Sequence, residues 1–173
     1  MAEPIFVVEY DPQWVRLFER ERARILDALN GLNVVIEHIG STAVPGLAAK
    51  PIIDILMIVE TAEDAMRAIT PLVRLGYTCY GEAEIAGRIY FDRRVYEPCH
   101  IHLYVKGNPE IARHLMFRDY LRAHPDARQA YAELKYALAE EFRNDRPAYT
   151  EAKTDFVRSI EARAREERAK GGQ

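Results

Sequence analysis

The alternation of hydrophobic and polar positions divides the first third of the chain into four predicted elements. Residues 5–10 form a short apolar run that predicts a strand. Asp11 is then placed to cap a helix whose apolar side chains recur at helical spacing until about residue 30. Residues 33–39 and 51–60 predict two further strands, and the second is almost continuously apolar. We therefore expect this strand to be buried on both faces, in a sheet that helices cover.

The middle of the chain predicts one helix followed by short strands. Thr61 and Asp64 have the spacing of a capping pair, and the helix that they begin ends at Gly76. Pro71 falls inside this helix and is expected to kink it or to divide it in two. Three shorter β candidates follow, at residues 77–80, 88–93 and 100–105.

Beyond residue 107 the pattern becomes helical. Three helices are predicted, at about 109–123, 126–142 and 146–168. The fold class is therefore α/β (α+β): a mixed sheet with flanking helices and a C-terminal helical extension. We expect one domain over residues 1–173, in which 1–106 form the α/β core and 107–173 the helical part.

Composition limits the classes of function. The 173 residues are 49% hydrophobic and 29% charged, as in a globular domain. The longest strictly apolar run, residues 55–59, is far shorter than the ~20 residues of a membrane span. The absence of a leader pattern and of a CxxC pair at Cys79 and Cys99 predicts a cytoplasmic protein. A net charge of −3 argues against polymeric nucleic acid as a partner and leaves room for a small phosphorylated ligand.

The stretch between two predicted strands carries the most chemistry. Gly40 allows close backbone approach, and Ser41 and Thr42 offer hydroxyls beside a turn, which suits a phosphate group. Lys50 supplies a counter-charge, and Asp54 is a lone acid in an apolar strand, which is costly unless it is paired or binds a metal. The alternative is that Ser41 only caps the turn while Asp54 bonds to nearby backbone.

Two histidines share one face of a later strand. His100 and His102, together with Asp54, offer a ligand set for zinc, manganese or iron. His102 is also a candidate phosphate contact or proton donor near neutral pH. The alternative is that one histidine is a hydrogen-bonded core residue and the other only lines a polar pocket.

Further candidates come from the middle strands and the last helices. Arg88 and Tyr90 lie on one strand face, either to clamp a phosphate and stack on a base or to form an ordinary solvent-facing hairpin. Tyr149 and Lys153 are four residues apart, so they reach a pocket together unless the lysine pairs with a surface acid. Lys135 is expected outside the apolar stripe of its helix.

The stretch from Gly40 to Ile55 resembles the signature of the GrpB proteins. The resemblance extends over nearly the whole chain and includes four shorter segments, at residues 10–14, 100–103, 117–122 and 149–153. It implies a nucleotidyltransferase-like fold, in a family whose domain is also found fused to dephospho-coenzyme A kinase.

Active nucleotidyltransferases resemble one another in a Gly-Ser turn followed by two acids one residue apart, with a third acid on a further strand. These acids hold two divalent metals. Here Gly40 and Ser41 match the turn and Asp54 matches the first acid, but Leu56 replaces the second. The strand that would carry the third offers His100 and His102 instead.

Three functions remain open at this point. The first is nucleotidyl transfer with Mg²⁺ or Mn²⁺, in which Asp54 and His102 are catalytic. The second, which Leu56 favours, is a non-catalytic module that binds a nucleotide or a coenzyme-A-like ligand. The third is a metal-dependent hydrolase built on Asp54, His100 and His102. The expected ligand-binding residues are Gly40, Ser41, Thr42, Lys50, Arg88, Tyr149 and Lys153.

Overall fold

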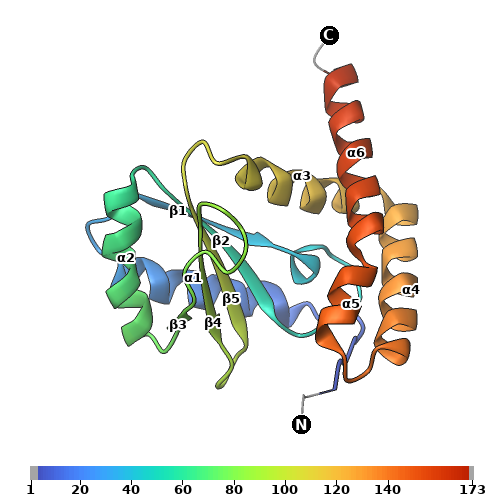
Figure 1. Ribbon diagram of the computed structural model, residues 1–173, viewed down its shortest axis with the longest axis horizontal. Helices are drawn as coiled ribbons and strands as arrows, with labels where there is room; N and C mark the ends of the chain where they lie inside the picture. Colours follow the sequence, from blue (N-terminus) through green and yellow to red (C-terminus); the bar gives the residue numbers. More distant parts are fainter. Residues whose placement is uncertain (1–3, 172–173) are drawn as a thin grey trace.

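The computed structural model describes residues 4–171 and is built around one five-stranded sheet (Figure 1). The strands lie in the order β1-β2-β5-β4-β3. Only β2 and β5 run parallel, and the other neighbours are antiparallel. The strands are β1 (Val34–Ile39), β2 (Ile53–Val59), β3 (Thr78–Cys79), β4 (Arg88–Arg93) and β5 (Cys99–Val105).

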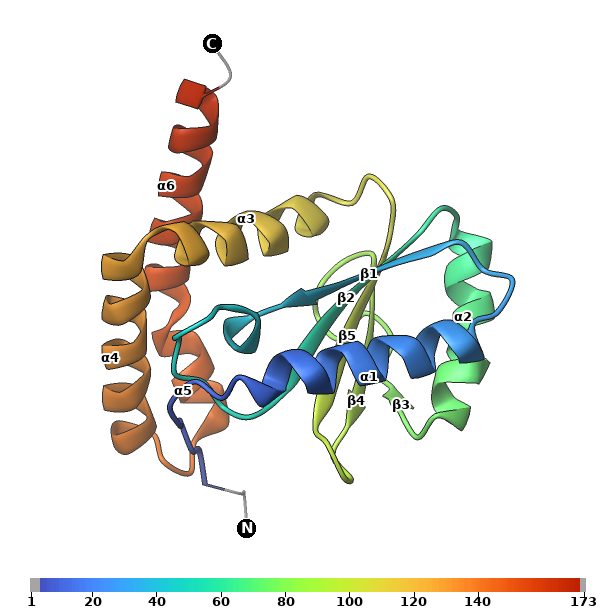
Figure 2. The same cartoon turned by 180° about the vertical axis from the view of Figure 1, so that it is seen from behind.

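Helices cover both faces of this sheet. They are α1 (Gln13–Ala28), α2 (Ala62–Arg74), α3 (Pro109–Ala123), α4 (Pro125–Glu141), α5 (Arg146–Ala152) and α6 (Thr154–Gly171), with a 3-10 turn η1 (Ser41–Ala43). Helices α1 and α2 pack on one face, and α3 lies over the other (Figures 1 and 2). Helices α4, α5 and α6 stand together beside one end of the sheet (Figure 2). The predicted mixed sheet with a helical C-terminal part is confirmed.

Strand β2 is buried on both faces, as its apolar sequence predicts. Ile55 and Met57 pack toward α1 and α2, and Leu56 packs toward α3, each with 0% exposure. Because side chains alternate along a strand, Asp54 lies on the α3 side with Leu56. The register places Asp54 beside His100 of β5, and His100 beside Asp92 of β4. Three polar residues therefore form one row across the sheet.

Most sequence-predicted elements are present. The Thr61 cap is confirmed, since its hydroxyl oxygen accepts from the Asp64 N–H at 3.1 Å. Of the two outcomes expected at Pro71, a kink or a division, the division does not occur, because α2 continues through this residue to Arg74. The Leu75 N–H still donates to the Pro71 carbonyl at 3.1 Å, so the last turn forms despite the proline.

Two predictions fail at the ends of the chain. Residues 5–10 form no strand; their one β-bridge joins Val8 to Ala49, because no strand of the sheet lies alongside. The single helix predicted over 146–168 is two helices, and the break falls at Lys153. The Lys153 N–H bonds to Thr150, three residues back, at 3.4 Å, which tightens and ends α5. This break places Lys153 between the two helices.

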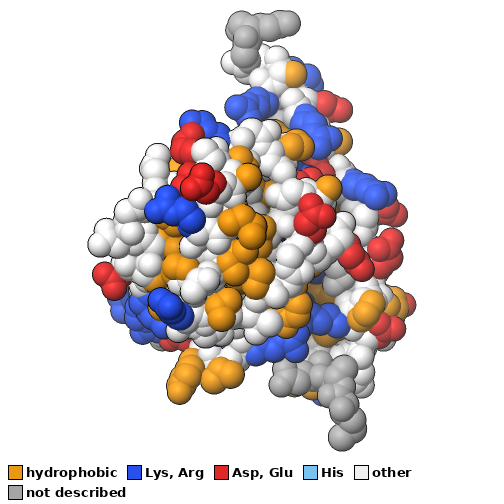
Figure 3. All heavy atoms as spheres, turned by 60° about the vertical axis from the view of Figure 1, so that its left-hand side comes forward, with side chains coloured by type: hydrophobic (Ala, Val, Ile, Leu, Met, Phe, Trp, Pro, Cys, Tyr) orange, Lys and Arg blue, Asp and Glu red, His pale blue; other side chains and the backbone are white. Residues whose placement is uncertain are grey.

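The surface mixes charges of both signs. In the space-filling view of Figure 3, hydrophobic side chains gather in the middle of one face, with basic and acidic side chains both scattered around them. No helix within residues 4–171 combines the length and apolar character that crossing a membrane requires.

Candidate phosphate-binding site

A polar pocket of about 210 Å³ lies where the η1 turn, the start of β2 and the C-terminal helices meet. The turn contributes Gly40 and Ser41, and β2 contributes Asp54. The helical part contributes Lys135 from α4 and Lys153 from the α5–α6 break. Residues more than a hundred positions apart in sequence therefore form one site, which we call the lysine pocket.

Three lysines line this pocket and reach it from three different segments. The Lys135 ammonium donates to Ser41 Oγ at 3.0 Å and also to the Ala48 carbonyl, and the residue is only 3% exposed. The Nζ atoms of Lys50 and Lys153 lie 5.1 and 4.2 Å from the centroid of the Tyr149 ring. Among the lining residues that the structure describes, Asp54 is the single carboxylate. Positive charge is therefore in excess.

The lysines destabilise one another's charged forms. Burial, followed by the charges of Lys153 and Lys50, lowers the pKa of Lys135 to about 7. Burial and the neighbouring Lys50 lower the pKa of Lys153 to about 8. Burial and Arg146 also lower the pKa of Lys50. A multiply charged anion in the pocket would relieve both the repulsion and the desolvation of these amines.

Asp54 is held by side chains, not by backbone. His100 Nδ1 lies 3.0 Å and His102 Nε2 lies 3.9 Å from Asp54 Oδ1. Burial raises the pKa of Asp54, but hydrogen bonds and charge from the two histidines outweigh it and keep that pKa well below its usual range. The side chain is 28% exposed, so the carboxylate remains in contact with the pocket. The alternative that Asp54 bonds only to backbone is wrong.

Gly40 is required by the geometry of the turn. Its φ of 71° and ψ of −171° belong to a region that only glycine adopts readily. A Cβ atom at this position would lie 2.5 Å from Asp54 Oδ2. The absence of a side chain lets the turn pass directly over the carboxylate.

Two arginines of α3 fix the turn from the other side. Arg118 donates to Glu37 Oε2 at 2.8 Å and to the His38 carbonyl at 3.0 Å. Arg122 donates to the Ala43 carbonyl at 2.8 Å. The segment 117–122, which the family resemblance includes, thus positions the site without lining it, apart from Phe117.

Two further predicted ligand residues, Thr42 and Tyr149, also line the pocket. The Thr42 hydroxyl donates to the Ile52 carbonyl at 3.3 Å and lies 3.0 Å from His38 Nε2. Burial lowers the pKa of His38 to about 4. Since the single hydroxyl proton goes to the Ile52 carbonyl, Nε2 of His38 is assigned as the donor in this contact. Tyr149 is 1% exposed and serves as an aromatic surface under two lysines.

Arg88 and His102 lie outside the lysine pocket. The Arg88 guanidinium donates to the carbonyls of Glu82 and Ala83 and lies 4.9 Å from the Tyr90 ring centroid, so it ties down the loop before β4. The His102 ring lies 5.5 Å from the ring of Tyr90 and 5.1 Å from that of His114. The structure therefore corrects the grouping of Arg88 with the phosphate-binding residues.

Sequence reasoning missed Lys135. The residue was expected outside the apolar stripe of its helix, yet it shares the buried face with Tyr131, one turn earlier. Its ammonium lies 4.5 Å from the centroid of the Tyr131 ring. The spacing of four residues between them was the available signal.

Comparison with protein families identifies the family of this chain. A family model described as "GrpB protein" matches residues 4–163. The chain belongs to the GrpB family. The family resemblance found in the sequence is thereby confirmed.

Relatives of this GrpB-family chain include several UPF0157 proteins. It is 39% identical to UPF0157 protein YqkA of Bacillus subtilis over 92% of its own length and 47% of the relative's. It is 42% identical to UPF0157 protein PA4798 of Pseudomonas aeruginosa, over 92% and 67% of the two chains. A dephospho-CoA kinase of Mycolicibacterium paratuberculosis is 29% identical over 93% of this chain and 46% of its own. The chain thus spans about half the length of some relatives.

One solved structure agrees with the family assignment. The crystal structure of GrpB from Enterococcus faecalis is 40% identical, with a TM-score of 0.86 over 92% of this chain and 96% of that one. A cytoplasmic RNA terminal U-transferase shows a weaker likeness, with a TM-score of 0.49 and 13% identity over 77% of this chain and 41% of that one.

The residues of this GrpB-family protein do not fit a two-metal centre. Leu56 is fully buried where a second acid would be needed, and one carboxylate does not bridge two hard cations well. His100 and His102 both approach the same oxygen of Asp54. Among residues 4–171, no group of three or more His, Cys, Asp or Glu side chains is arranged to hold a metal ion. The predicted three-ligand set is thus not formed.

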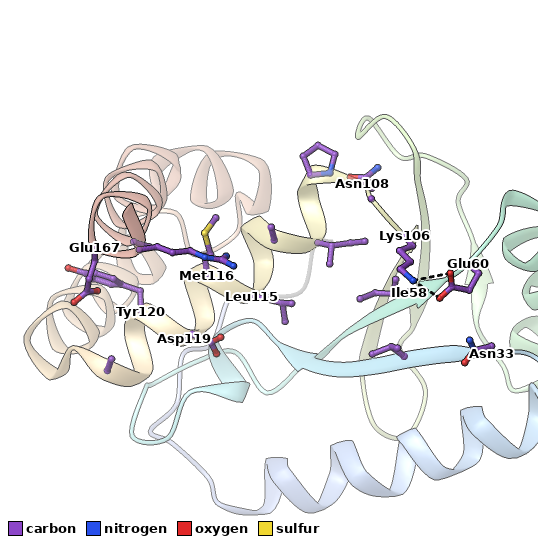
Figure 4. Close-up of a pocket in the computed structure, with 18 residues that line it drawn as sticks. Asn33, Ile58, Glu60, Lys106, Asn108, Leu115, Met116, Asp119, Tyr120 and Glu167 are labelled. Atoms are coloured by element: carbon purple, nitrogen blue, oxygen red, sulfur yellow. Dashed lines mark hydrogen bonds and ion pairs between the residues drawn. The ribbon is translucent and has the colours of Figure 1, made fainter. Parts of the chain in front are cut away.

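A larger hollow of this GrpB-family protein lies elsewhere. A groove of about 980 Å³ runs between strands β1 and β2 and helices α3 and α6, and its middle is apolar, with Ile58 and Leu115 (Figure 4). Lys106 and Glu60 pair at 3.1 Å at one end. The groove shares no lining residue with the lysine pocket. The lysine pocket is therefore identified by its side chains and not by its volume.

Proposed function

We propose that this chain binds a nucleotide or another small polyphosphate in the lysine pocket. The observation that carries the proposal is the convergence of Lys50, Lys135 and Lys153 on the Ser41 turn, with Asp54 as the single lining carboxylate among the described residues. Burial removes water from the ammonium groups of these lysines. A chain of phosphates would replace that water with charge-assisted hydrogen bonds. This function is that of a module that binds its ligand without catalysing a reaction.

Calorimetric titration tests the proposal directly. The full chain is titrated with inorganic tripolyphosphate and with nucleoside triphosphates, in the presence and absence of Mg²⁺ or Mn²⁺. We expect one binding site for each ligand, with an affinity that decreases as salt is added. If neither tripolyphosphate nor any nucleotide binds, the proposal is wrong.

We expect the affinity for tripolyphosphate to decrease as the pH rises from 7 to 9. The pKa values of Lys135 and Lys153, about 7 and about 8, mean that both amines lose protons in this range in the free protein. Binding favours their charged forms and therefore takes up protons. We expect at least a tenfold loss of affinity (roughly one order of magnitude per proton and pH unit), measured by titration in buffers of different ionisation enthalpy. A pH-independent affinity would contradict the role of these amines.

Nucleotidyl transfer is the second candidate function. Its support is Asp54, which is 28% exposed, lines the lysine pocket and bonds to His100. Since Leu56 leaves this carboxylate alone on its strand, a divalent cation would have to arrive with the nucleotide.

Removal of metal separates the two candidates. For a binding module, we expect chelation with EDTA to leave tripolyphosphate affinity within about threefold, and Asp54→Ala to tighten binding because it removes a negative charge beside three amines. If binding requires Mg²⁺ or Mn²⁺ and is lost in Asp54→Ala, the module is excluded and transfer is favoured. Thermal melting of the variant shows whether it remains folded.

A further inference from the structure

A second hollow of about 230 Å³ opens directly beside the lysine pocket. We call it the outer pocket; it includes Phe6, Pro51, Asp92 and Arg94, among others. The two hollows share three lining residues, Lys50, Ile52 and His100. One elongated ligand can therefore occupy both, and their combined volume lies within the range of small-molecule sites, roughly 300–1,000 Å³.

The outer pocket combines the cationic side chains of Lys50, Arg94 and Arg146 with an apolar wall. Its wall includes the apolar side chains of Ile5, Phe6, Pro51 and Pro98. The Phe6 side chain is 58% exposed, although its segment is fixed by the Ile5 N–H, which donates to the Arg143 carbonyl at 2.8 Å. An exposed aromatic ring held in place at the mouth of a pocket suits a flat ring of a ligand.

Asp92 gives this pocket a polar group that the protein itself does not fully use. The side chain is 6% exposed, and its Oδ2 accepts from Arg94 Nε at 2.9 Å. Its Oδ1 is buried and has no donor among residues 4–171. A buried acceptor without a donor is costly, and such groups in native proteins call for an explanation. The Arg94 side chain is 70% exposed, so it can turn aside as a ligand enters.

We propose that the two pockets form one site for a ribonucleoside polyphosphate. The phosphates lie on the lysines, a ribose hydroxyl donates to the Asp92 carboxylate, and the base lies against Phe6. Acceptance of a ribose hydroxyl by a carboxylate is a recurrent way of recognising nucleotides. The inference rests on the proposed function, because the lysine pocket must first bind phosphate.

The experiment compares the effect of Asp92→Asn on two ligands by calorimetry with the full chain. We expect the affinity for ATP to fall about tenfold, because a neutral amide oxygen accepts a weaker hydrogen bond than a carboxylate does. We expect the affinity for tripolyphosphate to stay the same or to rise, because the variant removes a negative charge. Wild type should bind either 2′-deoxy-ATP or 3′-deoxy-ATP about tenfold more weakly than ATP, and Asp92→Asn should not weaken that analogue further.

Matched controls isolate the contact. Asp27→Asn makes the same change at an exposed acid of α1 that lines neither pocket, and should leave both ligands unaffected. Phe6→Ala should weaken ATP but not tripolyphosphate, whereas Tyr136→Ala, which removes an exposed ring on α4, should change neither. Thermal melting confirms that each variant is folded.

The outcomes separate the two proposals. Equal effects of Asp92→Asn on ATP and tripolyphosphate, or no effect of either deoxy substitution, would overturn the ribose contact while the phosphate site stands. Failure of wild type to bind either ligand would overturn the proposed function, and the nucleoside site with it.

Discussion

Lys135→Met is expected to lower the affinity for tripolyphosphate by at least about thirtyfold. Loss of one partner from a buried, charged hydrogen-bonded contact costs about 2–5 kcal/mol. Lys135 is the most buried of the three amines and bonds to Ser41 at the base of the lysine pocket. Methionine keeps most of the length and apolar volume of the lysine stem, so the loss reports the ammonium group. Calorimetric titration at pH 7 measures it.

Lys106→Met is the control for this variant. Lys106 is an exposed lysine that pairs with Glu60 in the groove, and its replacement should leave the affinity unchanged. An equal loss in both variants would mean that overall charge, not the pocket, attracts the ligand. An unchanged affinity in Lys135→Met would remove Lys135 from the site.

Thermal melting of Lys135→Met without ligand gives an independent readout. The pKa of Lys135 is about 7 in the folded protein against 10.5 for an ordinary lysine. Between these values the unfolded chain binds more protons, so the free energy of unfolding of wild type rises with pH from about 7 upward and is lowest below 7. The variant lacks this dependence. Its Tm relative to wild type should therefore increase as the pH is lowered from 9 to 6.

Gly40→Ala is expected to destabilise the protein by about 3 kcal/mol or more. The backbone conformation alone costs about 1–3 kcal/mol for a residue with a side chain. The new Cβ would also lie 2.5 Å from Asp54 Oδ2, whose carboxylate is held by His100. For a chain of this length we expect a decrease in Tm of roughly 6–12 °C. Differential scanning calorimetry measures it.

Gly31→Ala is the matched control. Gly31 also has a positive φ, 89°, but a Cβ there meets no atom of the described residues within 4 Å. Gly31→Ala should lower the free energy of unfolding by only about 1–2 kcal/mol, which is the cost of the backbone conformation. In an Asp54→Ala background the cost of Gly40→Ala should fall toward this control value. Equal costs for the two glycines in the wild-type background would show that contact with Asp54 does not matter.

The central elements of the fold were predictable because their signals are local. β4 matches its predicted range, and the Thr61 cap forms as its spacing indicates. The strand predicted over residues 5–10 did not form, because an apolar run becomes a strand only where a neighbouring strand pairs with it. Whether such a neighbour exists depends on the topology.

The predictable part of the site is the part that is continuous in sequence. Gly40, Ser41, Lys50 and Asp54 fall within fifteen residues and line one pocket, as expected. Lys135 was missed, because a lysine on a helix is usually solvated and its burial depends on which element packs against it. Arg88 was grouped with the phosphate-binding residues because it shares a strand face with Tyr90, whereas its guanidinium donates to the carbonyls of its own loop.

The sequence by itself determined the family and the turn at Gly40 and Ser41, because a glycine and a serine within one short segment constrain the backbone locally. Only the tertiary structure decided that the pocket carries an excess of positive charge. Lys50, Lys135 and Lys153 come from segments far apart in the chain, and their repulsion exists only once folding buries them around one pocket. Long-range electrostatics of this kind depends on distance and burial, which the order of residues does not contain.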